Sequence, residues 1–520
     1  HTSAHLAAST PMTTFITGAP TLAHSLERCF RIYAPQRHFG SRASLNSAFT
    51  FRTYAEVGAD AAHLSAGMCA VDGPLALRRR ATVAIVAGNQ PSWMIADFAC
   101  CFGDFVSVGI HEAWGDEKVA HILLEADVAC AVCGSASAAQ LVLRGVDAAS
   151  NGGRRTLRAL ILLDSVVDDD GAIASAAAAL ELSVVRYAAL VQLGASRRTT
   201  HTGAGFGETS GYEAEVHASS DPDAACTLMY SSGTSGGAPK ATVTSKRVWR
   251  DTNCNPGPLG EIADFTERRV VSYMSFAHGS DRGVVWFSTF AGGEVGFAAP
   301  TGSARGALSA SASNLGPGAE LLALLPEQLD LLDAMRTLRP TFFLGLSDFW
   351  TTLYAAHKRL LERAVAADIC GGAAAAEGGA DAERGQVAAA LSTFRTAASL
   401  PSVDAMRASV AWPQLCASYL ATRAGGAVRQ HALRRTRAQL GDALLITVTG
   451  GSHTSDEVVE FMSHLMSAGN ESRAYNSYGS TEFPGISRNG EINAALELKL
   501  VPVVQVQTSS STVSSTVSST

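Results

Sequence analysis

The chain has 520 residues, of which 47% are apolar and 17% charged, and its net charge is −7. This composition supports a large core, either one α/β body with subdomains or several units, and it excludes intrinsic disorder for most of the chain. The nearly balanced charge argues against a nucleic-acid partner held by phosphate contacts. Ten cysteines in this length do not indicate a disulfide scaffold, so a reducing, cytoplasmic compartment is expected.

The first third of the chain alternates short apolar runs with helical segments. The apolar runs read as buried parallel strands at residues 81–86, 105–110, 127–132 and 160–163. Helices are expected between them at 93–102 and 118–125. This alternation predicts an α/β fold with mostly parallel sheets flanked by helices.

Segments rich in Gly, Ser, Thr or Ala interrupt this pattern and are expected to be loops or insertions, at 194–222, 301–318 and 366–401. The third could also be helical because of its alanines, although it has little to pack with. The last stretch, 508–520, reads TSSSTVSSTVSST and is expected to be a disordered tail. No uninterrupted run of about 20 apolar residues is present, so no transmembrane helix is predicted. The chain begins with His1 rather than Met, which leaves a targeting signal open.

The most informative motif is CTLMYSSGTSGGAPK at 226–240, an apolar strand that runs into a loop of glycines and hydroxyls. Glycines bring backbone N–H groups close to an anion, the hydroxyls add donors, and Lys240 adds a positive charge. Pro239 before the lysine and Ala241 after it separate the motif from the P-loop of NTPases. It predicts a polyphosphate cradle rather than an ordinary flexible loop, built from Ser231, Ser232, Gly233, Thr234, Ser235, Gly236 and Lys240.

A second motif, YNSYGSTE at 475–482, offers the groups that a nucleotide needs. The ring of Tyr478 can stack on adenine, and Gly479 permits a tight turn beside a ligand. Thr481 can donate to an α-phosphate oxygen, and Glu482 is a hard oxygen ligand suited to Mg²⁺. Taken alone, the motif is equally typical of a surface turn.

The segment 230–240 resembles the signature of the AMP-forming acyl-adenylating enzymes, which include acyl-CoA synthetases, luciferases and peptide-synthetase adenylation domains. The usual form is Y-[ST]-S-G-[ST]-[ST]-G-x-P-K, and here one extra residue stands at 237–238. Other family-like segments follow in order, at 53–57 (TYAEV), 89–93, 277–282 (AHGSDR), 339–341, 444–451 (LLITVTGG) and 488–492. Three of them, 277–282, 339–341 and 488–492, resemble the long-chain fatty acyl-CoA synthetases in particular.

The resemblance implies an AMP-binding N-terminal domain over residues 20–505, with the Ala/Gly-rich insertion 366–401 inside it. The implied reaction joins a long-chain fatty acid or other carboxylate to AMP and then to coenzyme A, with ATP and Mg²⁺. In this reading, residues 231–236 and Lys240 hold the β- and γ-phosphates. The implied adenine side is lined by Gly450, Gly451, Tyr478 and Gly479, the implied catalytic groups are Thr481 and Glu482, with Glu482 on the metal, and His278 is a wall of the acyl pocket.

The sequence departs from the family pattern in two places. His453 stands where the family has Pro after the Gly-Gly pair. Only 38 residues (520 − 482) follow Glu482, and Lys499, the sole lysine among them, lies in a strand-like run. We therefore expect a truncated chain without the small C-terminal domain and its catalytic lysine, and weak or no adenylation by this chain alone.

Three alternatives stay open. The chain could be the adenylation domain of a carboxylic acid reductase or assembly-line enzyme, or a catalytically dead nucleotide- or lipid-binding module. The basic run Arg429, Arg434, Arg435 and Arg437 reads as a solvated helix face, with peripheral association with an acidic intracellular membrane as the other interpretation. The Cys130-x-x-Cys133 pair reads as two buried strand residues rather than a redox or zinc site.

Overall fold

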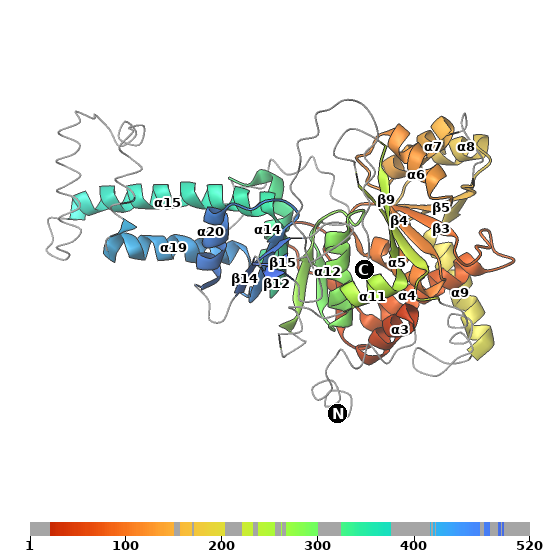
Figure 1. Ribbon diagram of the computed structural model, residues 1–520, viewed down its shortest axis with the longest axis horizontal. Coiled ribbons are helices and arrows are strands. Elements are labelled where there is room, and N and C mark those ends of the chain that lie inside the picture. Colours follow the sequence, from red (N-terminus) through yellow and green to blue (C-terminus); the bar gives the residue numbers. More distant parts are fainter. Residues whose placement is uncertain are drawn as a thin grey trace.

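The computed structural model describes residues 21–149, 156–168, 171–202, 221–231, 238–254, 262, 267–299, 324–375, 417, 420–421, 423–467, 473–478, 487–489 and 491–492. These residues form two large sheets with helices packed around them (Figure 1). The predicted α/β class with mostly parallel sheets is confirmed.

The first sheet contains seven strands of the described chain in the order β7-β6-β5-β3-β4-β8-β9, and every neighbouring pair is parallel except β8–β9. Its strands are β3 (Thr82–Val86), β4 (Val106–Gly109), β5 (Val128–Cys133), β6 (Ala159–Leu162), β7 (Ser183–Arg186), β8 (Ala225–Ser231) and β9 (Lys240–Ser245). The accompanying helices are α5 (Pro91–Phe102), α6 (Asp116–Glu125), α7 (Ala136–Ala149), α8 (Ala172–Ala179), α9 (Tyr187–Thr202) and α11 (Lys246–Asn253). Strands β3, β4 and β6 are buried along their whole length, as expected when helices cover both faces.

The second sheet joins nine strands of the described residues in the order β16-β15-β14-β13-β12-β10-β11-β1-β2. Its strands are β1 (Arg37–Ser41), β2 (Thr50–Thr53), β10 (Arg269–Ser272), β11 (Glu294–Phe297), β12 (Phe342–Leu346), β13 (Ile446–Gly450), β14 (Arg473–Tyr478), β15 (Ser487–Arg488) and β16 (Glu491–Ile492). The segment from β14 to β1 is parallel throughout, and β2, β15 and β16 add antiparallel edges. The accompanying helices are α3 (Leu22–Ile32), α4 (Tyr54–Cys69), α12 (Gly279–Phe290), α14 (Leu329–Leu338), α15 (Ser347–Ala375), α19 (Arg423–Gln439) and α20 (Asp456–Ser467), with a 3₁₀ turn, η5 (Pro326–Gln328), before α14.

The start of α4 illustrates how local sequence sets an element boundary. Thr53 Oγ1 accepts from the backbone N–H of Glu56 at 3.2 Å, and the Glu56 carboxylate accepts from the backbone N–H of Thr53 at 2.7 Å. This reciprocal capping box satisfies backbone donors that the first turn leaves without partners. The TYAEV segment therefore begins a helix, as the sequence predicted.

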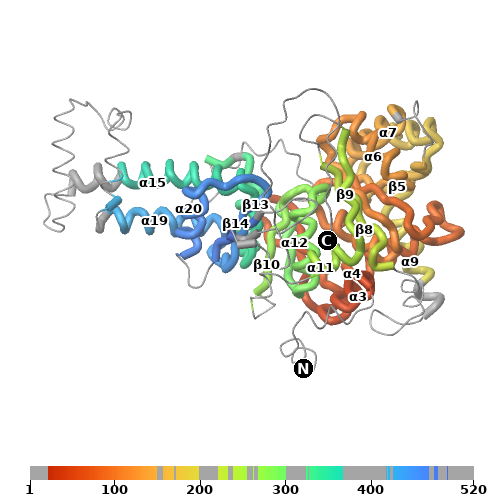
Figure 2. The backbone as a smooth tube through the Cα atoms, in the orientation of Figure 1, coloured from red at the N-terminus to blue at the C-terminus, as the bar shows by residue number. Residues whose placement is uncertain are grey.

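The core is divided into two clusters. The larger one packs the first sheet against strands β10, β11 and β1 of the second, and it includes Ile85, Trp286 and Val295. The smaller one, around Phe343 and Trp350, lies under α14, α15 and α20. Helices α15 and α19 pack together and run outward from the second sheet as a long pair (Figure 2).

One loop prediction is wrong in part. Residues 194–202, expected in a loop, continue α9, because Gly194 is a packing contact rather than a turn. A Cβ at Gly194 would lie 1.8 Å from the carbonyl oxygen of His63 on α4, so only glycine lets the two helices approach this closely. Residues 366–375 continue α15, the helical alternative that their alanines allowed, since alanine is a strong helix former. The segments 203–220, 301–318, 376–401 and 508–520 lie outside the described residues.

Candidate functional site

The predicted phosphate cradle sits on a hairpin at the edge of the first sheet. Strand β8 carries Ser231 as its last residue, and Ser231 is the register partner of Lys240, the first residue of β9. Ser231 is therefore a strand residue and not part of the loop, a correction that follows from its pairing with β9. The remaining cradle residues, Ser232, Gly233, Thr234, Ser235 and Gly236, lie outside the described residues.

The base of this hairpin is held by α6. Pro239 is buried, and its carbonyl oxygen lies 3.1 Å from Nε2 of His121, which can donate to it. His121 also lies 3.4 Å from the carboxylate of Glu125 on the same helix. Lys240 itself is exposed. The hairpin thus presents the hydroxyl-bearing Ser231 and the amine-bearing Lys240 at the same level, a donor pair that fits an anion.

The predicted adenine side lies at the carboxyl edge of the second sheet. Gly450 ends β13 and is the register partner of Leu346 on β12. A Cβ at Gly450 would lie 2.7 Å from the backbone oxygen of Ser477, so the glycine permits the close approach of β14. Gly451 has φ +87°, the left-handed region that favours glycine, and Tyr478 ends β14. This edge therefore brings Gly450, Gly451 and the backbone of Tyr478 together.

Three predicted residues of this side, Gly479, Thr481 and Glu482, lie outside the described residues. The structure leaves their roles as predictions. His453, which replaces the family's Pro, is exposed, and its backbone oxygen accepts from Ser347 Oγ at 2.7 Å. The turn after β13 is thus anchored to the start of α15.

His278 is the N-cap residue of α12 and is exposed. The turn that carries it is fixed by Asp281, whose buried carboxylate accepts from Ser272 Oγ at 2.7 Å and from the backbone N–H groups of Tyr273 and Met274 at 2.9 and 3.0 Å. Asn89, at the end of β3, donates to the same carboxylate at 3.1 Å. Burial raises the pKa of Asp281 to about 6, against the lowering effect of these hydrogen bonds.

Arg282, the next residue, ties α12 to the first sheet. Its guanidinium forms a two-point ion pair with Asp97 on α5, and both side chains are buried. It also donates to Thr227 Oγ1 on β8 and to Ser107 Oγ on β4, both at 2.7 Å. The Asp-Arg pair of the AHGSDR segment is therefore a buried tether between the two sheets, and α12 lies between them (Figure 1).

The carboxyl ends of β4, β8 and β10 converge beside His278. A Cβ at Gly109, the last residue of β4, would lie 2.7 Å from the Cα atom of Ala277, and a Cβ at Gly279 would lie 3.0 Å from the Met229 sulfur on β8. In parallel α/β sheets, ligands bind beyond the carboxyl ends of the strands. The two sheets thus bring His278 close to β8, the strand that leads into the predicted phosphate loop.

The sequence interpretation missed His111, which follows β4 by two residues. Its ring centroid lies 5.8 Å from that of His278. Partial burial and, second, the nearby His111 lower the pKa of His278. A histidine just beyond the carboxyl end of a predicted strand was the available signal, but only the tertiary contact pairs it with His278.

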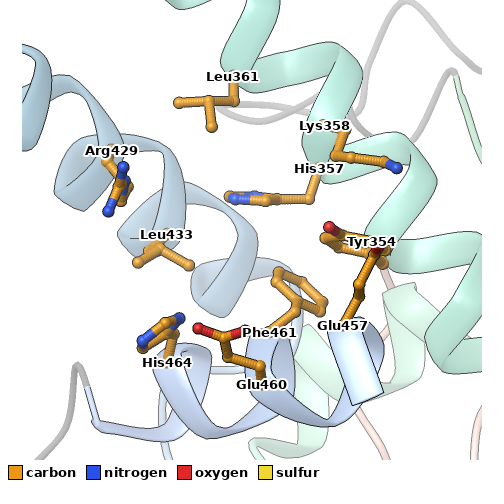
Figure 3. A pocket seen from close by; sticks show the side chains of 10 residues that line it. All are labelled: Tyr354, His357, Lys358, Leu361, Arg429, Leu433, Glu457, Glu460, Phe461 and His464. Atoms are coloured by element: carbon orange, nitrogen blue, oxygen red, sulfur yellow. The ribbon is translucent and has the colours of Figure 1, made fainter. Parts of the chain in front are cut away.

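A cavity of about 300 Å³ lies elsewhere, between α15, α19 and α20 (Figure 3). The ring of His357 projects into it between Phe461 and Leu433, and Arg429 and Glu460 stand at its margin (Figure 3). None of the predicted site residues that the structure describes lines this cavity. It is therefore distinct from the strand ends at which those residues gather.

Two minor predictions have different outcomes. Cys130 and Cys133 are buried residues of β5, and burial raises the pKa of Cys130 to about 12, so they lie where the strand interpretation put them. The basic run is not a uniformly solvated face, because Arg437 is buried and donates to the backbone oxygens of Leu465 and Leu444 at 3.0 and 2.8 Å. Among the helices that the structure describes, none combines the length and apolar character needed to cross a membrane.

Comparison with known proteins gives a consistent family. Residues 33–507 match the family model described as AMP-binding enzyme. Fatty acyl-CoA synthetase B of Dictyostelium discoideum is 23% identical over 53% of this chain and 37% of its own length. The peroxisomal long chain acyl-CoA synthetase 6 of Arabidopsis thaliana is 21% identical over 64% of this chain and 40% of its own length. The matched part of the chain thus spans about two fifths of these relatives.

Solved structures show the same fold. The A-PCP didomain of carboxylic acid reductase from Segniliparus rugosus, in complex with AMP, aligns with a TM-score of 0.61 at 15% identity, covering 94% of this chain and 56% of that one. The adenylation domain of a carboxylate reductase from Mycobacterium chelonae aligns with a TM-score of 0.60 at 16% identity, covering 96% and 66%. Identities this low establish the fold and leave the substrate to other arguments.

Proposed function

Because this chain belongs to the AMP-binding enzyme family, we propose that it is the adenylating part of an acid–thiol ligase that activates a long-chain fatty acid. The reaction is attack of the fatty carboxylate on the α-phosphorus of Mg·ATP, which releases pyrophosphate and gives acyl-AMP. The thiol of coenzyme A then attacks the acyl carbon, forming the thioester and releasing AMP. The family match over residues 33–507 is the observation that carries the proposal. Curated relatives named as a long-chain acyl-CoA synthetase and a long-chain-fatty-acid–CoA ligase support the substrate class.

The chemistry of this reaction is mainly positioning and charge neutralisation. Lys240 and Ser231, paired across the β8–β9 hairpin, fit a polyphosphate because one supplies a positive charge and the other a hydroxyl donor. The proposed cradle adds the hydroxyls and backbone N–H groups of residues 232–236. At the carboxyl edge of the second sheet, the turn at Gly450 and Gly451 lies beside the backbone of Tyr478 and forms the proposed adenine side.

The roles of the remaining predicted residues are part of the proposal. Thr481 donates to the α-phosphate, and Glu482 holds Mg²⁺ through its carboxylate. Mg²⁺ supplies neutralisation of phosphate charge, which favours attack by an anionic carboxylate. His278 stands where β4, β8 and β10 end, close to the carboxylate end of the acyl substrate.

A second candidate keeps the same chemistry but changes the acceptor. Carboxylic acid reductase adenylation domains share the fold over 94–96% of this chain, and the AHGSDR segment loosely resembles theirs. In that case the acyl group passes to a carrier domain instead of coenzyme A. Offering the adenylated enzyme free coenzyme A or an isolated carrier domain distinguishes the two acceptors.

The test of the proposed function is ATP–pyrophosphate exchange with dodecanoate and Mg²⁺, together with Mg²⁺-dependent ATP binding. We expect Glu482→Ala to abolish the Mg²⁺ dependence of ATP binding while the fold is retained, because the side chain acts as a ligand. The matched control is Glu362→Ala, which removes an exposed carboxylate on α15 and should leave ATP binding unchanged. Equal ATP affinity in wild type and Glu482→Ala, with Mg²⁺ present, contradicts the metal role.

A further inference from the structure

Two imidazoles stand together at the strand ends, those of His111 and His278. The His111 and His278 rings lie 5.8 Å apart, centroid to centroid, with planes inclined at 51°. His111 is half-buried and His278 is exposed. Within the described residues, His278 has no hydrogen bond through its ring, including at the N-cap of α12.

The hydrogen bonding of His111 fixes which of its nitrogens is free. Its Nδ1 accepts from the backbone N–H of Ala113 at 3.0 Å. A neutral imidazole with an accepting Nδ1 carries its proton on Nε2. His111 therefore keeps a donor available on Nε2, on a ring held by its own turn and by the neighbouring ring of Trp114, 6.4 Å away.

Both histidines are held rigidly by backbone contacts. His111 follows Gly109, whose absent side chain lets β4 approach Ala277 directly. His278 sits on the turn that the buried Asp281 carboxylate fixes through Ser272 and two backbone N–H groups. The backbone that carries both imidazoles is therefore fixed before a ligand binds, and the His111 ring is also held by its hydrogen bond from Ala113, which lowers the ordering cost of binding.

The surroundings of the pair favour one kind of anion. Ala277 and Met229 are buried beside the turn, and Trp114 is packed against His111. The neighbours of the pair are thus apolar, whereas the cationic Lys240 lies on the β8–β9 hairpin. Two hydrogen bonds of about 2.8 Å from the two rings to one carboxylate are compatible with their spacing.

We propose that His111 and His278 together bind the carboxylate of the acid substrate, each donating one hydrogen bond to one of its oxygens. This inference rests on the proposed function and adds His111 as a substrate-binding residue. The two imidazoles hold the carboxylate beside β8, the strand that leads into the phosphate hairpin. Their neutral donors orient the acid without the strong binding of a full cation, so its oxygen remains nucleophilic.

The test uses the whole chain and two substitutions that separate the two nitrogens of His111. In His111→Asn, the amide oxygen can replace Nδ1 as acceptor for Ala113, but nothing replaces Nε2. In His111→Gln, the longer amide can place a donor near the Nε2 position. We expect dodecanoate to bind roughly ten- to hundredfold more weakly to His111→Asn than to wild type, as for loss of a hydrogen bond to a charged group, and His111→Gln to recover much of the loss.

AMP is the matched second ligand, since its phosphate is the competing anion. AMP binding should be unchanged in His111→Asn. Weaker AMP binding with unchanged dodecanoate binding overturns the carboxylate assignment, and unchanged binding of both ligands overturns the role of His111 altogether. Failure of the wild-type chain to bind dodecanoate overturns the proposed substrate class and this inference with it. Equal dodecanoate affinity of wild type and His111→Asn overturns this inference alone.

A measurement on the wild-type protein tests the contact directly and uses a variant only to assign the resonance. With ¹⁵N-labelled histidine, dodecanoate should shift the Nε2 resonance of His111, identified by its loss in His111→Gln. The methyl ester of dodecanoate, which lacks the anionic oxygen, is the control and should leave that resonance in place. An ester that shifts it as strongly as the acid contradicts carboxylate recognition.

Discussion

Burial decides the charge state of single histidines far from the strand ends. His357 lies in the cavity between α15, α19 and α20, next to Phe461, with its Nδ1 2.8 Å from Thr436 Oγ1. Burial lowers its pKa to about 4. His38, stacked on Tyr54 in the main core, is similarly shifted, with a pKa of about 3. Both side chains are therefore neutral in the folded protein near neutral pH.

The lowered pKa of His357 predicts a pH dependence of the free energy of unfolding that a substitution of this residue can isolate. The pKa of His357 is lower in the folded chain than the value of about 6.5 expected in the unfolded chain. Its contribution to stability is therefore complete above about pH 6.5 and is lost as the pH falls toward 4, by up to about 3 kcal/mol. Urea unfolding of wild type and His357→Asn between pH 7 and 4 measures it. The variant keeps a hydrogen-bonding partner for Thr436 but does not titrate, so its stability should fall less steeply. Parallel curves for the two proteins contradict a buried neutral His357.

At the scale of elements, continuous apolar runs were reliable guides. The runs at 81–86, 127–132 and 160–163 became β3, β5 and β6 with boundaries shifted by a residue or so, because a strand buried on both faces must be apolar throughout. Glycine was not a reliable guide. Gly194 suggested a loop, yet it lies within α9, since sequence does not tell a glycine that turns the chain from one that allows close packing.

In the candidate site, too, local sequence features could be predicted and tertiary contacts could not. The strand that leads toward the predicted phosphate loop and the strand that ends at Gly450-Gly451 could be predicted, because each is contiguous in the sequence, whereas the return strand β9 was not predicted. The pairing of His111 with His278 and of Asp97 with Arg282 could not, because each joins residues more than 160 positions apart. Such contacts depend on how the two sheets dock, and no local pattern encodes that.

The contact at Gly194 predicts a large effect from one methyl group. In Gly194→Ala, the Cβ would lie 1.8 Å from the carbonyl oxygen of His63 on α4, so the helices must separate. Overpacking of this kind destabilises by about 1–3 kcal/mol. Gly426→Ala on α19 is the control: its Cβ would meet nothing within 4 Å, and alanine should stabilise the helix by up to about 1 kcal/mol. Thermal unfolding should rank the variants below and above wild type, and equal melting temperatures would argue against close α4–α9 packing.

For the whole molecule, the two sheets act as one unit because charged side chains are buried between them. Asp281 receives donors from both β10 and the end of β3, through Ser272 and Asn89. Arg282 reaches α5, β4 and β8 from α12. These contacts hold the carboxyl ends of the two sheets beside each other. Those ends carry the β8–β9 hairpin and the histidine pair. The geometry of the candidate site is thus a property of the interface between the sheets.

The Asp97–Arg282 pair makes this dependence measurable. Asp97→Ala leaves a buried guanidinium without its counter-charge and also removes the acceptor of Trp286 Nε1, 2.8 Å away. Removing one partner of a buried pair costs about 3–5 kcal/mol, which we expect as a loss in the free energy of unfolding from urea titration. The control is Asp116→Ala, which breaks an exposed pair with Arg144 and should cost at most about 1 kcal/mol. Arg282→Lys should also lower the free energy of unfolding although it keeps the charge, because an ammonium cannot reach Asp97, Ser107 and Thr227 at once as the forked guanidinium does. If Asp97→Ala and Asp116→Ala lose similar stability, the pair is a minor contact, and the sheets must be held together by apolar packing alone.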